Sequence, residues 1–449
     1  MSKFDLSPGS IDRAVDIALA RIDAIMIHFM ESCVGCAFCR YGCPFCYIDE
    51  KYYPVNKAED LRRMYRRKMS ISGRLLPLLV SAGMPSKKED IERILEFAYS
   101  ACSNCGACYL SCPFGIDSGV IINVLRTFLN ALGATPSPLK ELVKLETAGK
   151  FLESEGLLKT WEEAIGQVSE TIGRDAPLDK QGADVLLLPS LVEAALFPEA
   201  VSGAAKILES AGVDWTMPSK PLGVRPPLAV LVGDVWSARC TLRSLDEYIK
   251  SIGARDVVIL DGGFAYPALR WDAPALLGYT PEYRVLHIVE FLHEALKSRR
   301  IKLEQGDEEV TWHNPCQLGR RGGVTKEPSE VMKAVTRNFK PLPHEGAVAR
   351  CCGSGDAMSF IAPSLGASRI AQLAGVKVEL SDEERALVEK VERNFKLAAK
   401  RKLDDISATG VRTVVTACPT CIRTIEVTSS AYGTPLKVLH LAEFVAKHL

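Results

Sequence analysis

Two short segments of the chain carry the same arrangement of four cysteines. Both read C-x2-C-x2-C-x3-C and both are followed by proline; the cysteines are Cys33, Cys36, Cys39 and Cys43 in the first segment and Cys102, Cys105, Cys108 and Cys112 in the second. Thiolates in this run are typical ligands of 4Fe–4S clusters. The competing interpretations are a disulfide framework or zinc, which usually takes paired CxxC units. The spacing therefore predicts two cubane 4Fe–4S clusters that pass single electrons.

The fourth cysteine of each run has a special position. In two-cluster ferredoxins it binds the cluster of the other run. We therefore expect Cys112 to join Cys33, Cys36 and Cys39, and Cys43 to join the cysteines of the second run. Cys46, three residues after Cys43, is either a substitute ligand or a buried packing residue, and we favour packing.

A third group of candidate ligands lies near the C-terminus. Its cysteines are Cys316, Cys351, Cys352, Cys418 and Cys421. Each follows a predicted strand, and ligand sites of α/β proteins form at the carboxyl ends of strands. Five thiolates exceed what a tetrahedral zinc needs, so an iron–sulfur cluster with more than four protein ligands is the better interpretation.

Four other residues belong to the expected third site. Gly353 and Gly355 let the backbone approach a bulky group closely, and with Pro419 they are the residues expected against the cofactor. His313 precedes Cys316 by three residues and could donate a proton to a leaving thiolate. The alternative is a structural histidine.

The first two cysteine runs are expected within a helical module. Residues 11–30 have apolar positions at helical spacing, and helices are expected at roughly 57–82 and 87–100. A capping box is expected at the start of the second, with Ser86 as N-cap and Glu89 three residues later. Together they predict a helical two-cluster ferredoxin module over residues 1–135. A basic run on one helix is either a solvated face or a docking surface for an acidic electron partner: Arg62, Arg63, Arg66, Arg67 and Lys68.

The rest of the chain contains a diverged repeat. Segments 184–190, 253–261 and 285–291 match, in the same order, segments 310–316, 410–418 and 438–444. Short β-branched strands alternate with helices in both, which predicts an α/β fold with mainly parallel sheets; chance similarity is the alternative. We expect a helical linker over 136–183, a first repeat over 184–300 and a second over 301–449.

Only the second repeat retains its thiolates. Ser190, Asp261 and Phe264 are matched with Cys316, Cys418 and Cys421. We therefore expect the first repeat to support the fold and to form one wall of the site. The isolated Cys240 is expected to be structural, as are His287 and His440, which occupy equivalent repeat positions.

These motifs resemble a known family over nearly the whole chain. The chain is similar to the cysteine-rich CCG-domain proteins, in particular to the D-type catalytic subunit of heterodisulfide reductases. It is also similar to the K-type subunit of sulfite-reduction membrane complexes and to the iron–sulfur subunit of glycolate oxidase. The resemblance implies a noncubane 4Fe–4S cluster on Cys316, Cys351, Cys352, Cys418 and Cys421. In heterodisulfide reductases this cluster cleaves a disulfide in one-electron steps.

The chain departs from the family pattern in three ways, one of which is that the first repeat lacks its cysteine set, so only one such cluster is expected. A gap of 65 residues separates Cys352 from Cys418, enlarged by a charged segment at 376–400 that we expect to be an exposed helix or a lid. Gln317 replaces the second histidine of the family's His-Asp-Pro-Cys-His run, which puts a proton-donor role at that position in doubt.

Composition limits the function classes further. Lys plus Arg and Asp plus Glu both number 55, and this balance argues against a nucleic-acid binder. No apolar run reaches the ~18 residues that span a bilayer, and cysteines in ligand-like clusters favour a reducing compartment. We expect a cytoplasmic protein, or one held at the inner face of the membrane through a partner. No dinucleotide or P-loop motif is present, so a flavin would belong to another subunit.

Two functions fit this sequence. The first is an oxidoreductase subunit that reduces or forms a disulfide of a small thiol substrate at the five-cysteine cluster, with two cubanes exchanging electrons with a flavoprotein or a membrane cytochrome b-type subunit. The second is an electron-transfer subunit of a flavin-linked glycolate- or lactate-type dehydrogenase. Because the cysteine groups lie on separate modules, we expect changes in the ferredoxin runs to leave the third cluster intact.

Overall fold

The computed structural model describes residues 5–449, except for the side chains of Asp356 and Ala367. The main helices are α1 (Pro8–Leu19), α2 (Ala24–Glu31), α3 (Pro54–Met69), α4 (Ile71–Leu75), α5 (Lys88–Ser100), α6 (Ala107–Leu110), α7 (Ser118–Ala131), α8 (Ser137–Thr147), α9 (Glu155–Ile172), α10 (Leu191–Leu196), α11 (Pro198–Ser210), α12 (Val235–Ile252), α13 (Ala265–Pro267), α14 (Ala273–Leu277), α15 (Ile288–Lys297), α16 (Glu327–Val335), α17 (Ala367–Leu373), α18 (Asp382–Ser407), α19 (Pro419–Ala431) and α20 (Leu441–Ala446). The strands are β1 (Val185–Leu187), β2 (Trp215–Thr216), β3 (Asp256–Ile259), β4 (Arg284–His287), β5 (Val310–Trp312), β6 (Thr413–Thr416) and β7 (Lys437–His440). The short turns that bear on the site are η2 (Pro44–Tyr47), η5 (Leu228–Val232), η7 (Gln317–Arg321) and η9 (Asp356–Phe360).

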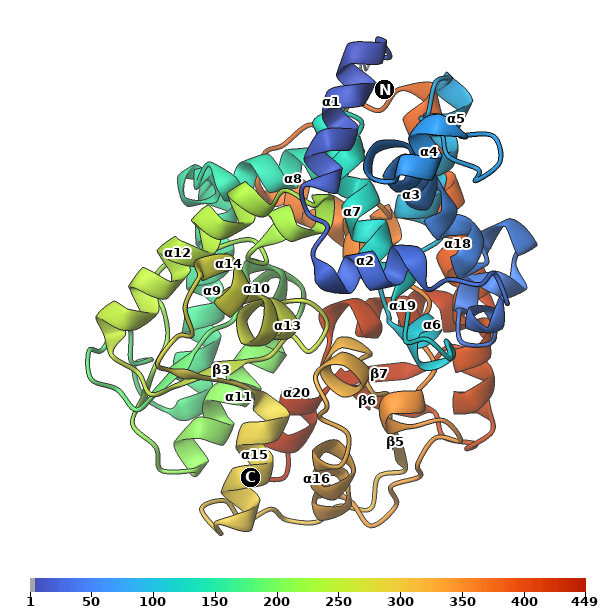
Figure 1. Cartoon of the computed structure of the whole chain (residues 1–449). Coiled ribbons are helices and arrows are strands. Elements are labelled where there is room, and N and C mark those ends of the chain that lie inside the picture. The colour runs from blue at the N-terminus through green and yellow to red at the C-terminus, as the bar shows by residue number, and fades with distance from the viewer. Residues whose placement is uncertain (1–4) are drawn as a thin grey trace.

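Helices α1–α7 gather at one end of the molecule, beside two halves that each contain a sheet (Figure 1). Residues 11–30 do not form the single helix expected. α1 ends at Leu19, and α2 restarts after Asp23, whose carboxylate accepts a hydrogen bond from Met26 N at 2.8 Å. Such an N-cap stabilises a helix start by about 1 kcal/mol, so the local side chain divides the apolar pattern in two.

The other two expected helices also have different ends. The stretch at 57–82 stops at Met69, where Ser70 caps the short helix α4. The predicted capping box of Ser86 and Glu89 is wrong. Helix α5 begins after Lys87, and the Asp90 carboxylate accepts hydrogen bonds from the backbone N–H groups of Ser86 and Lys87. An acidic side chain of the first turn satisfies these N–H groups in either arrangement, and the sequence does not distinguish neighbouring positions.

Two parallel sheets carry the repeat. Their strand orders are β2-β1-β3-β4 and β5-β6-β7, so β1, β3 and β4 correspond to β5, β6 and β7. Val185 pairs with Asp256, and Val310 pairs with Thr413. Asp256 and Thr413 occupy equivalent positions in the repeat, so their partners Val185 and Val310 also correspond. The sequence match instead places Asp184 opposite Val310, one residue away. Beyond the strands the offset disappears, since Ser190 and Cys316 both stand immediately before the helical turn that follows β1 and β5.

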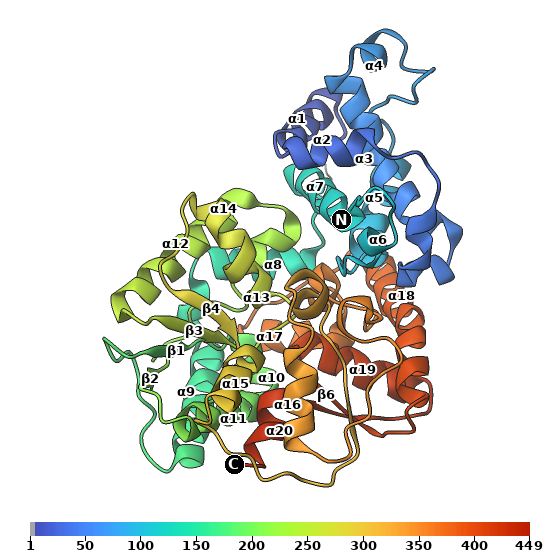
Figure 2. The ribbon, with the colours of Figure 1, turned by 60° about the horizontal axis from the view of Figure 1, so that its bottom comes forward.

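The charged segment 376–400 contains the expected helix, which has one exposed face and one buried face. Its C-terminal part belongs to α18, which packs against α5, η2 and α19 between the helical end and the second half (Figure 2). Val391, Phe395 and Ala398 are buried on one side of α18. Asn394 Nδ2 donates to Ser100 O at 3.0 Å. The expectation of an exposed helix holds for one face only, because a long helix keeps a continuous apolar stripe even when most of its residues are charged.

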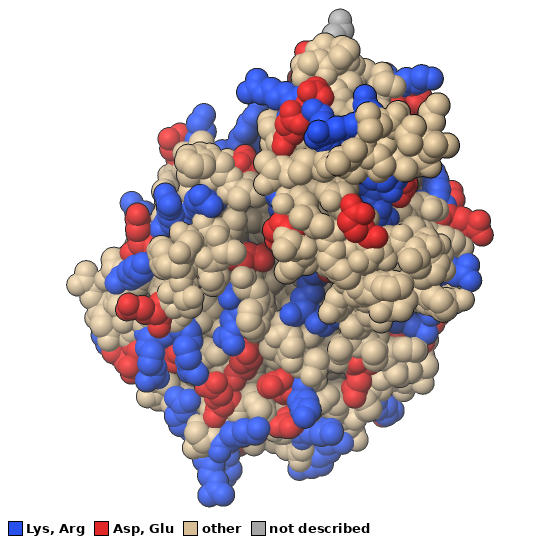
Figure 3. All heavy atoms as spheres, in the orientation of Figure 1, with Lys and Arg blue, Asp and Glu red and all other residues tan. Residues whose placement is uncertain are grey.

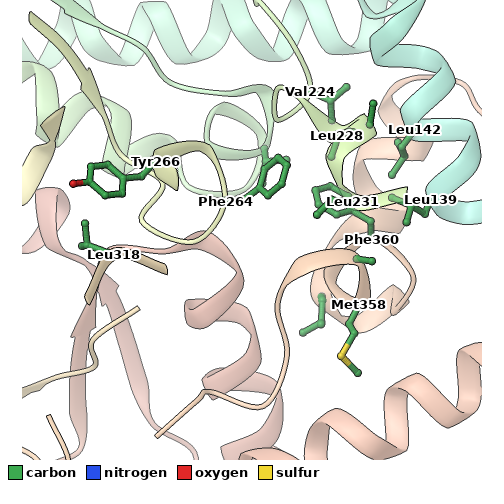
Figure 4. Packing of buried hydrophobic residues seen from close by; sticks show 14 of the residues in the cluster. Leu139, Leu142, Val224, Leu228, Leu231, Phe264, Tyr266, Leu318, Met358 and Phe360 are labelled. Atoms are coloured by element: carbon green, nitrogen blue, oxygen red, sulfur yellow. The ribbon is translucent and has the colours of Figure 1, made fainter. Parts of the chain in front are cut away.

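One hydrophobic core runs through all parts of the chain. Figure 4 shows one place where they meet: Leu139 and Leu142 of α8 lie near Leu228 and Leu231 of η5 and near Phe360 of η9. The division at residues 135, 183 and 300 stays our proposal for the sequence units. No helix among the described residues is long and apolar enough to cross a bilayer.

Candidate iron–sulfur sites

The two four-cysteine runs lie side by side. Cys43 of the first run lines one cavity together with Cys102, Cys105 and Cys108 of the second. Cys39 has Cys112 among its charged neighbours. These groupings are what an exchange of the fourth cysteines between two clusters requires, and four thiols around a common cavity fit a 4Fe–4S cluster. The ligand assignment is our proposal.

A buried lysine from α3 lies beside the cavity. Lys57 Nζ donates to Ala101 O at 2.5 Å and lies 3.6 Å from Cys43 Sγ. Burial alone would lower the pKa of Lys57, but the neighbouring Cys43 and Cys102 thiolates raise it above its ordinary value. Lys57 is therefore a fixed positive charge that offsets the negative charge of thiolates held out of water. Cys46 is half-buried and hydrogen-bonded to Cys43, consistent with a packing role.

The third group of cysteines forms one connected cluster of thiols. Cys351, Cys352, Cys418 and Cys421 belong to one cluster of packed, buried side chains, and Cys316 packs against it. Cys316 is half-buried and the other four are buried. Thiols from three separate segments thus converge, although the first and last of them, Cys316 and Cys421, are 105 positions apart in the sequence.

The ends of the second sheet hold these thiols in place. Cys316 follows β5, while Cys418 follows β6 and caps α19, its Sγ accepting from Cys421 N at 3.4 Å. Pro419 is the first residue of α19 and fixes the start of that helix between the two cysteines. The positive end of the α19 dipole favours thiolates at both positions.

The adjacent pair is held by glycine and by α18. Gly353 N donates to Cys351 Sγ at 3.4 Å. Gly353 has φ +107°, and a Cβ there would lie 2.6 Å from Phe395 O and 2.6 Å from Ala399 N of α18. Only glycine fits that close approach. Gly355 has φ +126°, a backbone conformation that residues with a side chain rarely adopt. A Cβ there would lie 3.7 Å from its nearest neighbour, Ser103 O, so the backbone conformation, and not a lack of space, requires glycine.

His313 lies against the thiols, as its position before Cys316 predicted. A nitrogen of its ring and the sulfurs of Cys352 and Cys421 lie within 4.8 Å of one another. Neither ring nitrogen meets an oxygen or nitrogen partner among the described residues. Burial lowers the pKa of His313, against the attraction of the Cys352 thiolate. Orphaned buried nitrogens beside convergent sulfurs fit a metal-containing group.

Lys402 of α18 is a second buried cation near this group. Its Nζ lies 4.0 Å from Asp405 Oδ2 and forms no hydrogen bond to the described residues. Burial lowers the pKa of Lys402 to about 8, opposed by Asp405 and by the thiolates of Cys351 and Cys352. Sequence analysis missed Lys402 because it lies among exposed charges. Its place in the apolar stripe, seven residues after Phe395, is the signal that identifies it.

The second cysteine run directly contacts the third group. Cys105 and Cys351 belong to the same cluster of buried side chains, and Ser103 Oγ lies 3.4 Å from Cys351 Sγ. Arg320 Nη1 donates to Cys105 O at 2.7 Å, and Gln317 Nε2 donates to Asn104 O at 2.8 Å. Gln317 thus ties the two sites together. The expectation that the runs and the third group are independent modules is wrong for the second run.

The first half of the repeat supplies one wall of the site. Arg225 forms a buried ion pair with Asp261, 2.6 Å from Nε to Oδ2, and donates to Thr420 Oγ1 at 2.9 Å. A Cβ on Gly263 would overlap Cys418 Sγ. An aspartate that pairs with arginine therefore stands near the thiols of the other half.

A cavity of about 210 Å³ opens beside Cys351 between the helical end and the second half. Basic side chains line it: Arg320, His344, Arg350 and Arg401. Arg350 Nη1 lies 3.1 Å from Asp405, its one acidic contact among the described residues. The cavity therefore offers an excess of positive charge close to a thiol.

The expectation for Cys240 needs correction. Cys240 is exposed on α12 rather than structural. The basic run on α3 is not a uniform docking face: Arg62 is buried, Arg66 pairs with Glu59, and Lys68 pairs with Asp12 and Asp16.

The paired histidines agree with a structural role. His287 and His440 are buried, and their Nδ1 atoms accept from Val289 N and Ala442 N to cap α15 and α20. Their Nε2 atoms both bond Leu260 O, at 2.9 and 3.2 Å.

Known proteins share these features. Residues 29–116 match the 4Fe-4S dicluster domain family, and residues 310–382 and 384–426 match the Cysteine-rich domain family. The chain is 24% identical to the D subunit of the dihydromethanophenazine:CoB--CoM heterodisulfide reductase of Methanosarcina barkeri, over 97% of this chain and 98% of that one. It is 24% identical to the Hdr-like menaquinol oxidoreductase iron-sulfur subunit 2 of Archaeoglobus fulgidus, over 74% and 68%. Identity to the corresponding reductase chain of Methanosarcina mazei is 25%, over 77% and 82%.

The chain thus joins a 4Fe-4S dicluster domain, which implies two 4Fe–4S clusters, to a Cysteine-rich domain region with parallel sheets. It is a heterodisulfide reductase-like iron–sulfur oxidoreductase subunit, distantly related to the D-type chains across most of its length. The expected resemblance and fold class are confirmed. Its relatives are subunits of multisubunit redox complexes.

Proposed function

We propose that this chain reduces or forms a disulfide at a noncubane 4Fe–4S cluster held by Cys316, Cys351, Cys352, Cys418 and Cys421. The observation that carries the proposal is the convergence of five thiols and His313 in one buried group. The remaining ligand sets are Cys33, Cys36, Cys39 and Cys112, and Cys102, Cys105, Cys108 and Cys43. When bound, the third cluster would accept single electrons while holding a sulfur of the substrate.

Reduction of a disulfide consumes two electrons and two protons and releases two thiols. The exposed Cys36 places the first cubane set where a redox partner can reach it. The second set adjoins Cys351 through Cys105, so electrons from the partner would arrive one at a time beside the site. His313 is positioned to pass a proton to a leaving thiolate, and the surrounding apolar residues exclude water.

The basic cavity beside Cys351 supports a class of substrate. Arg320, Arg350 and Arg401 would attract carboxylate, sulfonate or phosphate groups. We therefore propose that the disulfide, or the pair of thiols formed from it, carries anionic groups that orient a sulfur toward the thiols.

Iron content and one cysteine change test the proposal. Anaerobically purified protein should hold about twelve iron atoms, four per cluster. Cys352→Ser should abolish oxidation of a reduced dye by anionic disulfides, because serine is a harder ligand that iron–sulfur clusters seldom accept, while dithionite still reduces both cubanes. The exposed Cys240→Ser variant is the matched control and should retain full turnover. Undiminished turnover in Cys352→Ser, or zinc at the third site, would refute the proposal.

A second candidate function is electron relay without disulfide chemistry. It is favoured by the relatives named as a menaquinol oxidoreductase subunit and, in Syntrophomonas wolfei, as an EtfAB:quinone oxidoreductase. In that case, as in a flavin-linked dehydrogenase, all disulfides would leave the electron paramagnetic resonance spectrum of the protein unchanged. A thiol-dependent signal lost in Cys352→Ser would exclude the relay.

A further inference from the structure

The loop that follows α4 exposes a set of large apolar side chains. Residues 70–83 leave the helical end of the molecule and return to it, and α4 projects outward at the end farthest from the sheets (Figure 2). Ile71, Leu75, Leu78 and Leu79 are 77%, 74%, 95% and 80% exposed. A contiguous exposed apolar surface of this kind marks an interaction site.

The loop is held in this conformation at both ends. Ser70 Oγ accepts from Gly73 N at 2.9 Å, and a Cβ on Gly73 would overlap the Arg66 carbonyl, so α4 packs tightly on α3. On the return side, Gly83 N donates to Arg63 O at 3.1 Å. These contacts fix the backbone of the loop, and the loop holds its leucines exposed to solvent.

The charged residues of the loop itself and of the chain just before and after it have one sign. Residues 61–88 include eight Lys and Arg and no Asp or Glu. Arg63, Arg67 and Arg74 are exposed, and the last two donate to the carbonyl oxygens of Gly73 and Lys68 rather than to carboxylates. Figure 3 shows uncharged surface at this end of the molecule with Lys and Arg beside it; the acidic residues nearby include those of α1 that pair with Lys68.

We propose that loop 70–83 binds the surface of an anionic lipid bilayer. Leu75, Leu78 and Leu79 would enter the boundary between headgroups and acyl chains, and the arginines would lie at the lipid phosphates. Long cationic side chains around an apolar tip suit this interface, because their stems lie in the apolar layer while their charges stay in water. This contact would hold the chain at a membrane by its own residues and does not depend on disulfide chemistry.

Vesicle co-sedimentation of the complete, cluster-loaded protein tests the proposal. Wild-type protein should bind phosphatidylglycerol vesicles and lose affinity as salt is raised. Leu75→Ser/Leu78→Ser/Leu79→Ser should weaken binding at least about 100-fold. Arg63→Gln/Arg67→Gln/Arg74→Gln should weaken it about fivefold for each charge removed, and should not alter the weaker binding to phosphatidylcholine.

The matched control replaces three exposed apolar residues elsewhere: Leu152→Ser/Trp236→Ser/Trp271→Ser. It should bind phosphatidylglycerol like wild type, and iron content should be equal in all variants. Wild-type protein that ignores phosphatidylglycerol vesicles would overturn the proposal and assign the loop to a protein partner. Binding that survives the three leucine changes would overturn it as well.

Discussion

Lys402 brings a positive charge to a group of side chains that is otherwise rich in negative charge. Its amine is buried with Asp405 as the nearest acid, and the thiols of Cys351 and Cys352 lie within electrostatic reach. A fixed cation favours the reduced, more negative state of a neighbouring redox centre. At an effective dielectric constant of about 20, a unit charge roughly 8 Å away contributes about 2 kcal/mol.

We therefore expect Lys402→Met to lower the reduction potential of the third cluster by roughly 50–100 mV. The potentials of the two cubanes should change far less. Lys402→Arg, which retains the charge, should restore most of the potential. The measurement is a redox titration followed by electron paramagnetic resonance.

The control lies on the same helix. Lys400 is exposed, so Lys400→Met removes the same charge where water screens it and should leave the potential unchanged. Equal potentials in Lys402→Met and Lys400→Met would show that the buried amine does not act on the cluster.

For single residues, the sequence predicts function best where a metal group determines the spacing of its ligands. Ligand cysteines follow a pattern set by the metal group, so the two runs and the pair Cys418 and Cys421 could be assigned without a structure. Lys402 and Arg225 could not, because nothing in their neighbours along the chain distinguishes a buried cation from an exposed one. Only the packing of distant segments decides that.

Among the elements, α18 supports the loop that carries the adjacent cysteines. Gly353 lies against Phe395 and Ala399, with no room for a Cβ. Gly353→Ala should therefore displace the loop and remove the third cluster, leaving about eight iron atoms of about twelve. Iron analysis and the spectra of the cubanes check this.

Gly433 provides the matched control for backbone conformation. It has φ +71° with nothing within 4 Å of a Cβ. Gly433→Ala also places alanine at a positive φ, at a cost of about 1–2 kcal/mol, but without the collision, and should retain all three clusters. Full iron content in Gly353→Ala would show that α18 does not set the position of the cysteine loop.

Strands were easier to predict than helix ends. The repeated β-branched segments became β3, β4, β6 and β7, because buried parallel strands need continuous apolar residues. The starts of α2, α4 and α5 depend on backbone N–H groups that donate to Asp23, Ser70 and Asp90. Each such bond competes with alternatives one or two residues away at nearly equal free energy.

In the whole molecule, the helical end and the third cysteine group are joined through the second run. Cys105→Ala should disturb both its cubane and the thiol-dependent signal of the third cluster, because Cys105 contacts Cys351. Cys36→Ala, in the exposed first set, should disturb a cubane alone. A third-cluster signal identical in both variants would contradict the coupling.

The two buried histidines make stability depend on pH. Burial lowers the pKa of His287 to about 3 and that of His440 to about 4, below the value of about 6.5 in an unfolded chain. The unfolded chain therefore takes up protons first as the pH falls. The stability is fully present above pH ~6.5 and is lost progressively as the pH falls toward about 4 and 3, by about 2 kcal/mol per histidine at pH ~5.

His287→Asn/His440→Asn should reduce this dependence. Asparagine can still cap both helices but does not titrate, so the drop in unfolding free energy between about pH 7.5 and about pH 5 should shrink by about 4 kcal/mol. Urea unfolding followed by circular dichroism measures it. The exposed His28→Asn variant should keep the wild-type profile, and an unchanged profile in the double variant would rule out the two histidines as the source.

The carbonyl of Leu260 accepts from both histidines, one from each half of the repeat. A single backbone oxygen thus connects the two halves of the chain that contain the two sheets. Removal of residues 184–300 would take away the carbonyl of Leu260, to which His440 is hydrogen-bonded. It would also remove Gly263, which lies against Cys418 Sγ. We therefore expect a shortened chain of residues 301–449 to be insoluble, because the first half covers buried residues of the second.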